Sequence, residues 1–346
     1  LGVLDAHGYD RVRPPLLEFE ASLSGRMANG GRRIENRAMF RFVDPASLRT
    51  LALRSDITPQ VGRIASTSLK DAPRPLRLAY CGDTVVIKAS QLDPARERLQ
   101  LGAELIGADS VAAASEAVML AVEALQAAGL TGISVDFTLP DLVDTLAAEA
   151  LPLAPDQIEA VRRELDTKDA GGLRSAGGAA YLPLLYATGP FDQALAALRA
   201  VDAGGALATR LDALEQVAAS IGDAARITLD PTERHGFEYQ SWFGFTLYAD
   251  GLRRAAGRGG TYRIAGSDEP ATGFTLYLDR LAEAAPQPEA AKLVWLPLGH
   301  DRAAAARLRA EGWRTRAQIL EGEDPAALGC THVLKDNAPV AREARR

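Results

Sequence analysis

Residues 229–249 form a stretch with the composition of a ligand-binding wall. Polar and aromatic side chains crowd between two apolar ends that are rich in strand-forming residues. Gly236 and Gly244 stand where a backbone could turn or approach a ligand closely. The stretch is too polar for an ordinary core strand and too regular for a disordered loop. It therefore predicts strands that line a small-molecule site.

A glycine-rich stretch, residues 257–262, follows and leads to an apolar run at 273–281. The backbone N–H groups of Gly257 to Gly260 could form an anion-binding nest. Because such glycines more often let the chain reverse direction, we predict a turn here.

The segment Asp56-Ile57-Thr58-Pro59 has the composition of a helix start. A carboxylate or hydroxyl just ahead of a proline at the first helical position caps free backbone N–H groups. By residue type alone, Asp56 could therefore be a helix cap and nothing more.

Length, charge and composition narrow the class of protein. The 346 residues predict two domains, and a content of 47% hydrophobic residues is enough for an ordinary core. With a net charge of −6 and no basic block, the chain offers no electrostatic footprint for nucleic acid. No apolar run approaches the roughly 20 residues that a membrane helix needs. We therefore expect binding to neither nucleic acid nor membranes.

The cysteines and histidines predict neither disulfides nor metal binding. Cys81 and Cys330 are far apart in the sequence, which favours a reducing, cytoplasmic setting. The four histidines are scattered, and neither HExxH nor CxxC occurs. A Walker A loop, a Gly-x-Ser-x-Gly elbow and a Cys/His nucleophile pair are also missing. The sequence thus predicts no metal, no cofactor and none of the familiar catalytic sets.

Periodicity organises the chain into a larger and a smaller part. Residues 141–222 differ from their surroundings, because Ala, Leu, Asp, Glu and Arg recur there at helical spacing, and we interpret them as a helical insertion. A proline-containing linker at 284–288 precedes a small α/β appendage. The other predicted elements are a hairpin of strands 37–43 and 51–54, strands 76–88 and 99–107, a helix at 110–128, a strand at 133–139, further strands within 226–282, a strand at 293–298, a helix at 301–311 and a strand at 331–334.

Six short motifs follow one another along the chain: Leu53-Arg54-Ser55-Asp56-Ile57-Thr58, Tyr80-Cys81-Gly82, Gln100-Leu101-Gly102-Ala103-Glu104, Gly236-Phe237-Glu238-Tyr239, Gly259-Gly260-Thr261-Tyr262 and the run 273–281. In this order they resemble the catalytic domain of histidyl-tRNA synthetase. They resemble even more closely its non-synthetase branch, the regulatory subunits of ATP phosphoribosyltransferase. Each motif is weak alone, but six in series, split by a helical insertion, are specific.

The resemblance implies a class II aminoacyl-tRNA synthetase-like module. This is an α+β fold in which an antiparallel sheet is flanked by helices, and members usually form dimers. The module would span residues 1–282, with the helical insertion at about 141–222. Residues 286–346 would then form a small C-terminal α/β domain.

The resemblance also implies a pocket for histidine. The positions it implies for the ammonium group are Asp56, Thr58 and Gln100, those for the imidazole nitrogens are Glu104 and Tyr239, and the one for the ring face is Tyr262. An ammonium group has three donors and requires a carboxylate plus neutral acceptors, which these residue types supply.

Other roles are open to the same residues. Gln100 and Glu104 could be exposed strand residues, the usual fate of such side chains. Tyr239 and Tyr262 could be half-buried core aromatics. The joint order of the motifs, rather than any single residue, favours the pocket.

Two departures from the synthetase pattern argue against catalysis. Adenylate formation needs cations where negative charge develops. The synthetase pattern has three such arginines. At the first position this chain has Val85-Val86, and at the second it has His235. Arg234 stands one place before His235, and on a strand its side chain would point to the opposite face. The third arginine is present as Arg280, which could contact a nucleotide or form a structural ion pair. Without the other two we favour the structural role, and we expect no aminoacylation.

Further departures affect recognition of the ligand. Trp242 stands where the family often has glycine, and Thr261 and Arg263 replace an arginine and an aspartate of the family signature. With His235 in place of an arginine, the carboxylate of the ligand has no evident charged partner.

The resemblance therefore implies a regulatory subunit with no catalytic residues of its own. Its partner would be the catalytic subunit of short-form ATP phosphoribosyltransferase, which joins ATP to phosphoribosyl pyrophosphate in the first step of histidine biosynthesis. Four regulatory and four catalytic chains would form a hetero-octamer, with L-histidine as the feedback effector. Two alternatives stay open: a divergent class II ligase that activates an amino acid, and an amino-acid sensor with another partner.

Overall fold

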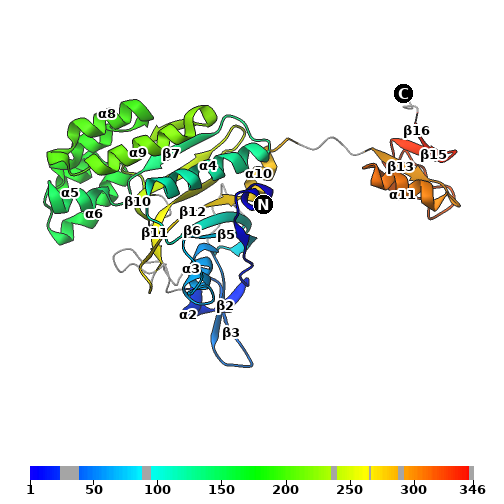
Figure 1. Cartoon of the computed structure of the whole chain (residues 1–346), viewed down its shortest axis with the longest axis horizontal. Coiled ribbons are helices and arrows are strands. Elements are labelled where there is room, and N and C mark those ends of the chain that lie inside the picture. The colour runs from blue at the N-terminus through cyan, green and yellow to red at the C-terminus, as the bar shows by residue number, and fades with distance from the viewer. Residues whose placement is uncertain (24–38, 88–94, 235–239, 265, 287–291, 343–346) are drawn as a thin grey trace. The chain divides into compact units, whose positions relative to one another are not determined.

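The computed structural model describes residues 1–23, 39–87, 95–234, 240–264, 266–286 and 292–342. It divides the chain into two compact units, Leu1–Ala285 and Pro286–Arg346 (Figure 1). The larger unit is built around one sheet, and the candidate site lies on a face of that sheet.

The large sheet has nine strands in the order β1-β5-β6-β12-β11-β10-β7-β9-β8. The six strands from β5 to β7 pair antiparallel, which confirms the predicted antiparallel sheet, while β1–β5 and β7–β9 are parallel pairs toward its edges. In spatial order the strands are β1 (Asp10–Arg11), β5 (Leu76–Val85), β6 (Glu97–Ile106), β12 (Glu269–Tyr277), β11 (Gly257–Ile264), β10 (Gln240–Tyr248), β7 (Ser134–Thr138), β9 (Arg226–Leu229) and β8 (Gly189–Pro190).

The turn predicted at Gly257–Gly260 is wrong, because these residues lie inside β11 and are paired on both sides. The glycines serve close packing instead of chain reversal. A Cβ atom on Gly257 would lie 2.4 Å from the carbonyl oxygen of Thr275, and one on Gly259 would lie 2.4 Å from that of Gly273. Such contacts are far inside van der Waals distance, so only glycine fits at positions 257 and 259.

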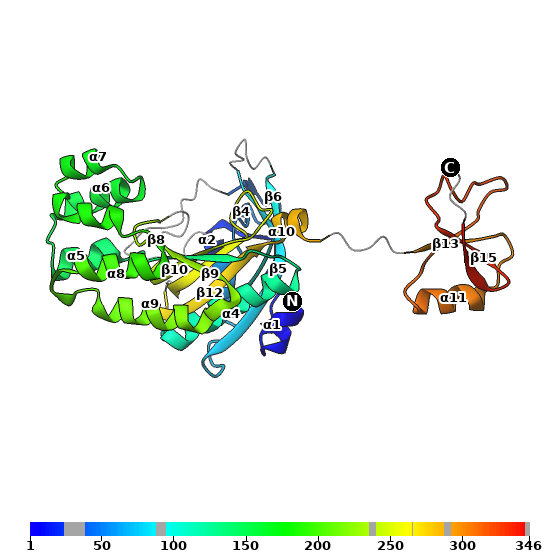
Figure 2. The same ribbon diagram turned by 90° about the horizontal axis from the view of Figure 1, so that it is seen from above.

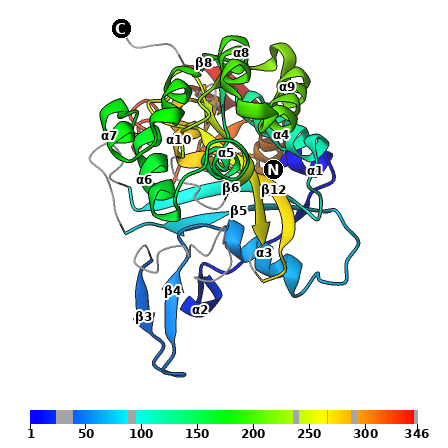
Figure 3. The same ribbon diagram turned by 90° about the vertical axis from the view of Figure 1, so that its left-hand side faces the viewer.

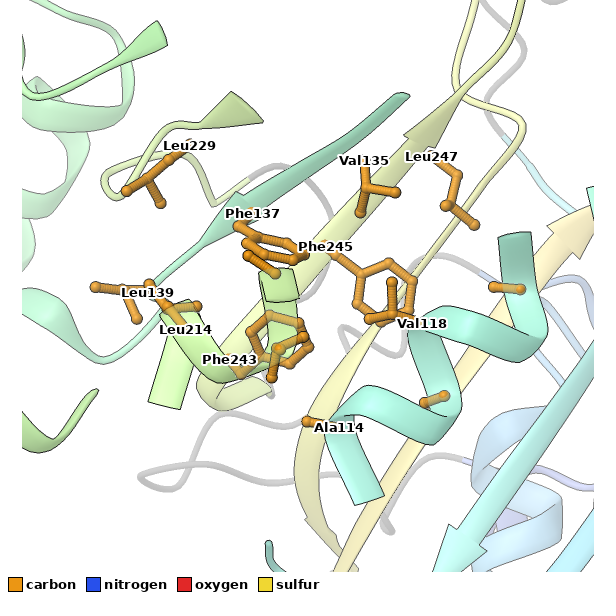
Figure 4. Close-up of a cluster of buried hydrophobic side chains, with 14 of the residues drawn as sticks. Ala114, Val118, Val135, Phe137, Leu139, Leu214, Leu229, Phe243, Phe245 and Leu247 are labelled. Carbon is orange, nitrogen blue, oxygen red and sulfur yellow. The ribbon is translucent and has the colours of Figure 1, made fainter. Parts of the chain in front are cut away.

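One face of the sheet packs against helix α4 (Val111–Ala127), which in turn packs against α9 (Ala208–Ile221) (Figure 2). The predicted helix at 110–128 is confirmed, and the hydroxyl of Ser110 caps it by accepting from the backbone N–H of Ala113 at 3.2 Å. Figure 4 shows the aromatic and aliphatic side chains of this interface, among them Phe137, Phe243 and Phe245. The phenyl rings of Phe137 and Phe243 meet edge to face at 5.2 Å.

The chain between β7 and β9 is largely helical and gathers at one end of the unit (Figures 1 and 2). Besides α9 it contains α5 (Leu142–Glu149), α6 (Pro155–Asp166), α7 (Ala170–Ser175), the 3-10 helix η2 (Ala179–Tyr186), α8 (Phe191–Val201) and two short 3-10 turns, η3 (Ala203–Gly205) and η4 (Gly222–Ala224). Its core is continuous with that of the sheet.

A second, three-stranded sheet lies beside helices α2 and α3 (Figure 3). Its β3–β4 pair confirms the hairpin predicted from the alternating residues. The elements of this region are β2 (Leu17–Phe19), α2 (Glu20–Leu23), β3 (Arg41–Val43), β4 (Thr50–Leu53) and α3 (Thr58–Ser66). The N-terminal helix α1 (Gly2–Ala6) packs instead against α4.

Two boundaries differ from the sequence expectations. Helix α3 starts where predicted, but Ile57 occupies its N-cap position. Asp56 therefore stands one residue before the cap, and its carboxylate accepts a hydrogen bond from the backbone N–H of Thr58 at 3.3 Å. Residues 278–282, predicted within a strand region, instead begin helix α10 (Leu278–Ala284). Arg280 consequently projects from a helix.

The smaller unit has its own four-stranded sheet in the order β14-β13-β15-β16, which confirms the predicted α/β character. Asp301 caps its helix by accepting from the backbone N–H of Ala303 at 2.7 Å. The elements are β13 (Leu293–Leu296), α11 (Arg302–Ala310), β14 (Arg314–Ala317), β15 (His332–Lys335) and β16 (Ala338–Ala341). Across the described ranges of both units, no helix has the length and apolarity to cross a membrane.

Candidate functional site

The second face of the large sheet, opposite α4, carries polar side chains at strand positions that alternate with the apolar ones. Strand register brings them together. Tyr80 on β5 lies across from Gly102 on β6, which lies across from Thr275 on β12. One row farther along, Glu104 on β6 lies across from Gly273 on β12. Residues distant in sequence therefore share one surface.

The phenol of Tyr80 is the centre of a buried hydrogen-bond network. Its oxygen lies 2.7 Å from the hydroxyl of Thr275 and 3.1 Å from that of Thr58, and it donates to Oε1 of Glu104 at 3.3 Å. Burial and the neighbouring acids raise the pKa of Tyr80, so the phenol keeps its proton. Tyr80 thus links the start of α3 to the carboxyl group on β6.

Glu104 is 1% exposed, an uncommon place for a carboxyl group. The hydroxyl of Tyr262 donates to its Oε2 at 2.8 Å. Burial raises the pKa of Glu104 to about 8, because the hydrogen bonds from neighbouring hydroxyls offset the loss of water only in part. A Cβ on Gly273 would fall 1.8 Å from Oε2, so only glycine fits opposite this carboxyl.

Gln100 and Asp56 lie on the same side of the network. Gln100 is 6% exposed, and its Oε1 accepts from the backbone N–H of Ile57 at 3.4 Å. Asp56 is half-buried, and loss of water raises the pKa of its carboxyl. The charge of Asp56 also raises the pKa of Glu104.

The structure thus brings five of the predicted ligand residues into one cluster around Tyr80: Asp56, Thr58, Gln100, Glu104 and Tyr262. The alternative in which Gln100 and Glu104 are exposed strand residues is wrong. Tyr239, the sixth predicted residue of this pocket, and His235, a possible site residue, lie outside the described residues.

Arg280 has structural contacts. Its guanidinium donates to the carbonyl oxygen of Ala255 at 2.8 Å and lies over the ring of Tyr277, 4.3 Å from the centroid. These contacts tie α10 to the loop before β11.

Three residues of the cluster were not selected from the sequence. Tyr80 stands in a quoted motif, and Thr275 alternates with Gly273 along β12, so strand periodicity was the available signal for both. Arg54 follows the apolar run of β4. It is buried, and it donates to the carbonyl oxygens of Asp83, at 2.7 Å, and Pro14, at 2.8 Å, which anchors the segment leading to Asp56.

The unusual Trp242 faces α4 and α9, away from the polar cluster. Its indole N–H donates to Asp109 at 3.2 Å, and its ring lies 5.3 Å from that of Phe243. It lines a cavity of about 310 Å³, together with Asp109, Ser110, Val111, Thr209, Arg210 and Ala213. The size of Trp242 therefore does not obstruct Glu104.

Thr261 also has a structural explanation. The register between β10 and β11 shifts between Gln240 and Gly244, which removes regular ladder bonds. The hydroxyl of Thr261 accepts from the backbone N–H of Phe243 at 3.2 Å and lies 3.3 Å from its carbonyl oxygen. It replaces the missing backbone partner at the irregularity.

Among the residues that the structure describes, no group of three or more His, Cys, Asp or Glu side chains could hold a metal ion. The cluster instead offers acids, hydroxyls and an amide in a dry environment. This chemistry suits a small polar molecule with an ammonium group and a second hydrogen-bonding end.

Comparison with known proteins gives consistent results. The family described as histidyl-tRNA synthetase matches residues 1–281. ATP phosphoribosyltransferase regulatory subunits from Rhodospirillum centenum and Paramagnetospirillum magneticum are 42% and 43% identical, over 94% and 97% of this chain and 86% and 90% of theirs. A Bacillus halodurans crystal structure, described as an ATP phosphoribosyltransferase regulatory subunit/histidyl-tRNA synthetase, superposes with a TM-score of 0.79 at 26% identity, covering 95% of this chain and 89% of that one.

Proposed function

The chain belongs to the family of ATP phosphoribosyltransferase regulatory subunits, built on the histidyl-tRNA synthetase fold, and we propose that it activates a separate catalytic subunit and senses L-histidine for it. The partner would be the short-form catalytic chain of ATP phosphoribosyltransferase, at the entry to histidine biosynthesis. The names of the relatives support the regulatory role.

The observation that carries the histidine assignment is the buried polar cluster around Tyr80. Asp56, Thr58 and Gln100 supply the carboxylate and neutral acceptors that an ammonium group requires. Glu104 supplies a hydrogen-bonding carboxyl for one imidazole nitrogen, with Tyr262 beside it. A purely structural interior would be better served by hydrocarbon, because buried polar groups cost free energy unless every one is paired.

The positions at which the synthetase would stabilise the charge of a nucleotide lack that capacity in this chain. Val86 cannot stabilise a phosphate, and Arg280 is engaged with the carbonyl oxygen of Ala255 and the ring of Tyr277. Removing a single preorganised electrostatic group commonly lowers a rate on the order of 10²-fold or more. These features support a chain that binds an amino acid without activating it.

Feedback then requires two states of the assembly with different affinities for histidine. We assign the less active state the higher affinity, with a coupling free energy of roughly 1–3 kcal/mol, the usual range for allosteric proteins. In the proposed assembly four regulatory and four catalytic chains form a hetero-octamer.

Reconstitution tests the proposal. A short-form catalytic subunit is mixed with this chain, and phosphoribosyl-ATP formation is followed while size-exclusion chromatography with light scattering reports assembly. We expect stimulation of the rate, co-elution at the mass of a hetero-octamer, and no histidine-dependent exchange of pyrophosphate into ATP by the chain alone.

Absence of both stimulation and co-elution would reject the regulatory role and favour a sensor with another partner. Histidine-dependent pyrophosphate exchange would favour the amino-acid ligase.

A further inference from the structure

The cavity of about 310 Å³ beside Trp242 is separate from the polar cluster around Tyr80. Small-molecule pockets of proteins have volumes of roughly 300 to 1,000 Å³, so this cavity is large enough for a compact ligand. Its walls come from the start of α4, from the first turns of α9 and from Trp242 on β10. None of its lining residues belongs to the proposed histidine site.

The cavity lies where two parallel helices begin (Figure 2). The starts of α4 and α9 both line it, whereas near their ends the side chain of Gln126 donates to the carbonyl oxygen of Ala224 at 3.2 Å. About one turn beyond the cavity, Ala114 on α4 and Leu214 on α9 are fully buried (Figure 4). The open space is therefore confined to the first turns of the two helices.

The indole ring of Trp242 forms an aromatic wall of this cavity. Its N–H donates to Oδ1 of Asp109 at 3.2 Å, and its ring lies 5.3 Å from that of Phe243. Val111 and Ala213 add apolar surface beside it. Because aromatic rings pair favourably in offset or edge-to-face arrangements, such a wall suits a ligand that carries an aromatic ring.

Arg210, in the first turn of α9, is the hydrogen-bond donor of the cavity. It pairs with Asp141 through Nε, at 3.2 Å from Oδ1, and through Nη2, at 2.6 Å from Oδ2. Within the part of the chain that the structure describes, Nη1 makes no hydrogen bond. A guanidinium has five N–H donors, so the edge of Arg210 that includes Nη1 can still receive a carboxylate.

Asp109, just ahead of α4, is the acceptor on the opposite wall. Its Oδ1 accepts from Trp242, and its Oδ2 lies 3.7 Å from Nη2 of Arg263. A carboxylate offers about four acceptor positions, so Asp109 can accept from a further donor.

The charges around the cavity balance in two pairs. Arg210 is paired with Asp141, and Asp109 is paired with Arg263. A ligand with a net charge of either sign would meet one attractive and one repulsive wall. A ligand that carries both charges and no net charge meets attraction at both walls.

We propose that this cavity binds an aromatic α-amino acid in its zwitterionic form. The ring of the ligand lies against Trp242, its carboxylate accepts from Arg210, and its ammonium group donates to Asp109. All three side chains are already fixed by other contacts, so binding requires little further ordering. This site is independent of the proposed histidine site and would stand without it.

Isothermal titration calorimetry with three related probes tests the proposal, in the presence of saturating L-histidine. L-phenylalanine has both charged groups, 3-phenylpropionate lacks the ammonium group, and phenethylamine lacks the carboxylate. We expect the wild-type chain to bind L-phenylalanine at least roughly tenfold more tightly than either analogue, because a hydrogen bond to a charged group is commonly worth that factor or more.

Two variants assign the charged groups. Arg210→Met should weaken L-phenylalanine binding roughly tenfold and leave the affinity for phenethylamine unchanged. Asp109→Asn keeps an acceptor for the indole N–H of Trp242, and it should weaken L-phenylalanine binding while leaving the affinity for 3-phenylpropionate unchanged. The matched control is Glu104→Gln in the polar cluster, which should not change the affinity for L-phenylalanine.

Three results would overturn the inference. These are a wild-type chain that does not bind L-phenylalanine, equal affinities for L-phenylalanine and 3-phenylpropionate, and binding that is lost in Glu104→Gln, which would place the ligand in the polar cluster. Thermal melts without ligand report whether Arg210→Met, which also loses its pair with Asp141, is folded. If it is not, Asp109→Asn carries the test, and an unchanged affinity for L-phenylalanine there would contradict the proposed site.

Discussion

The two faces of the large sheet differ in the buried polar groups that they carry. On the α4 face, Phe137, Phe243 and Phe245 exclude water with hydrocarbon and make ring contacts at 5.2 and 5.6 Å. On the other face, Tyr80 and Glu104 are equally buried but are joined by a hydrogen bond. A smaller apolar cluster that includes Ile57, Val61 and Ile106 packs beside them. The same strands supply both surfaces, because successive side chains of a strand point to opposite sides.

The difference separates stability from ligand binding. Buried hydrocarbon contributes about 25 cal/mol per Å² of apolar surface and requires no ligand. A buried acid such as Glu104 gains no such stabilisation, and its raised pKa reports the cost of burial. We infer that the apolar clusters on both faces hold the unit together, whereas the polar network around Tyr80 is retained for recognition.

The largest expected effect is on the α4 face. Phe243→Ala should lower the free energy of unfolding by about 3–5 kcal/mol, because it leaves a cavity among packed rings. Urea denaturation followed by circular dichroism measures this loss. The matched control is Phe42→Ala, whose ring is 44% exposed and whose removal should change stability by no more than about 0.5 kcal/mol. Equal losses in the two variants would contradict the assignment of this face as the core.

The next effect concerns the ligand. Histidine at about 100 times its dissociation constant should stabilise the wild-type chain by roughly 2.7 kcal/mol, seen as a raised melting temperature. Glu104→Gln should abolish that rise, because it removes the acid proposed to bind the imidazole, while the variant stays folded. A rise of wild-type size in Glu104→Gln would contradict the assigned site.

A third effect depends on pH. The pKa of Glu104 is about 8 in the folded chain against an ordinary value of 4.5, so the folded state retains a proton that the unfolded state releases between these values. The stabilisation that Glu104 contributes is therefore fully present below pH 4.5 and is lost as pH rises toward 8, with a slope of at most about 1.4 kcal/mol per pH unit.

The difference in free energy of unfolding between the wild type and Glu104→Gln, measured from pH 5 to pH 8 without ligand, isolates this contribution. We expect the wild type to lose stability relative to the variant as pH rises. A difference that is independent of pH would show that Glu104 titrates normally.

The smallest expected effect tests on which face of the sheet Trp242 acts. Trp242→Phe removes the hydrogen bond to Asp109 and should cost about 1 kcal/mol. Histidine affinity should be unchanged, because Trp242 faces α4 and α9. Calorimetric titration measures that affinity, and a change of tenfold or more would place Trp242 on the ligand side after all.

The sequence carries much of this architecture, since alternation and helical periodicity predict the elements and motif order predicts the polar cluster. It does not show which strands are neighbours. Glu104 and Gly273 are adjacent only because β6 pairs with β12, far along the chain, and no local pattern encodes that pairing. The same limit explains why the sequence does not reveal the roles of Tyr80 and Thr275.

The glycine-rich stretch forms a strand instead of the predicted turn for a related reason. Only glycine fits at positions 257 and 259, because a Cβ atom there would collide with carbonyl oxygens of the neighbouring strand β12. Composition alone cannot reveal that contact. The direction of Trp242 could not be predicted from strand alternation either, because the register between β10 and β11 is irregular between Gln240 and Gly244.

The most direct measurement of the central claim is a histidine titration of phosphoribosyl-ATP formation by complexes reconstituted with the wild-type chain and with Glu104→Gln. If the polar face is the sensor, both complexes are active, histidine inhibits the wild-type complex, and the Glu104→Gln complex is insensitive. Inhibition of both complexes at the same histidine concentration would contradict the account and put the effector site elsewhere.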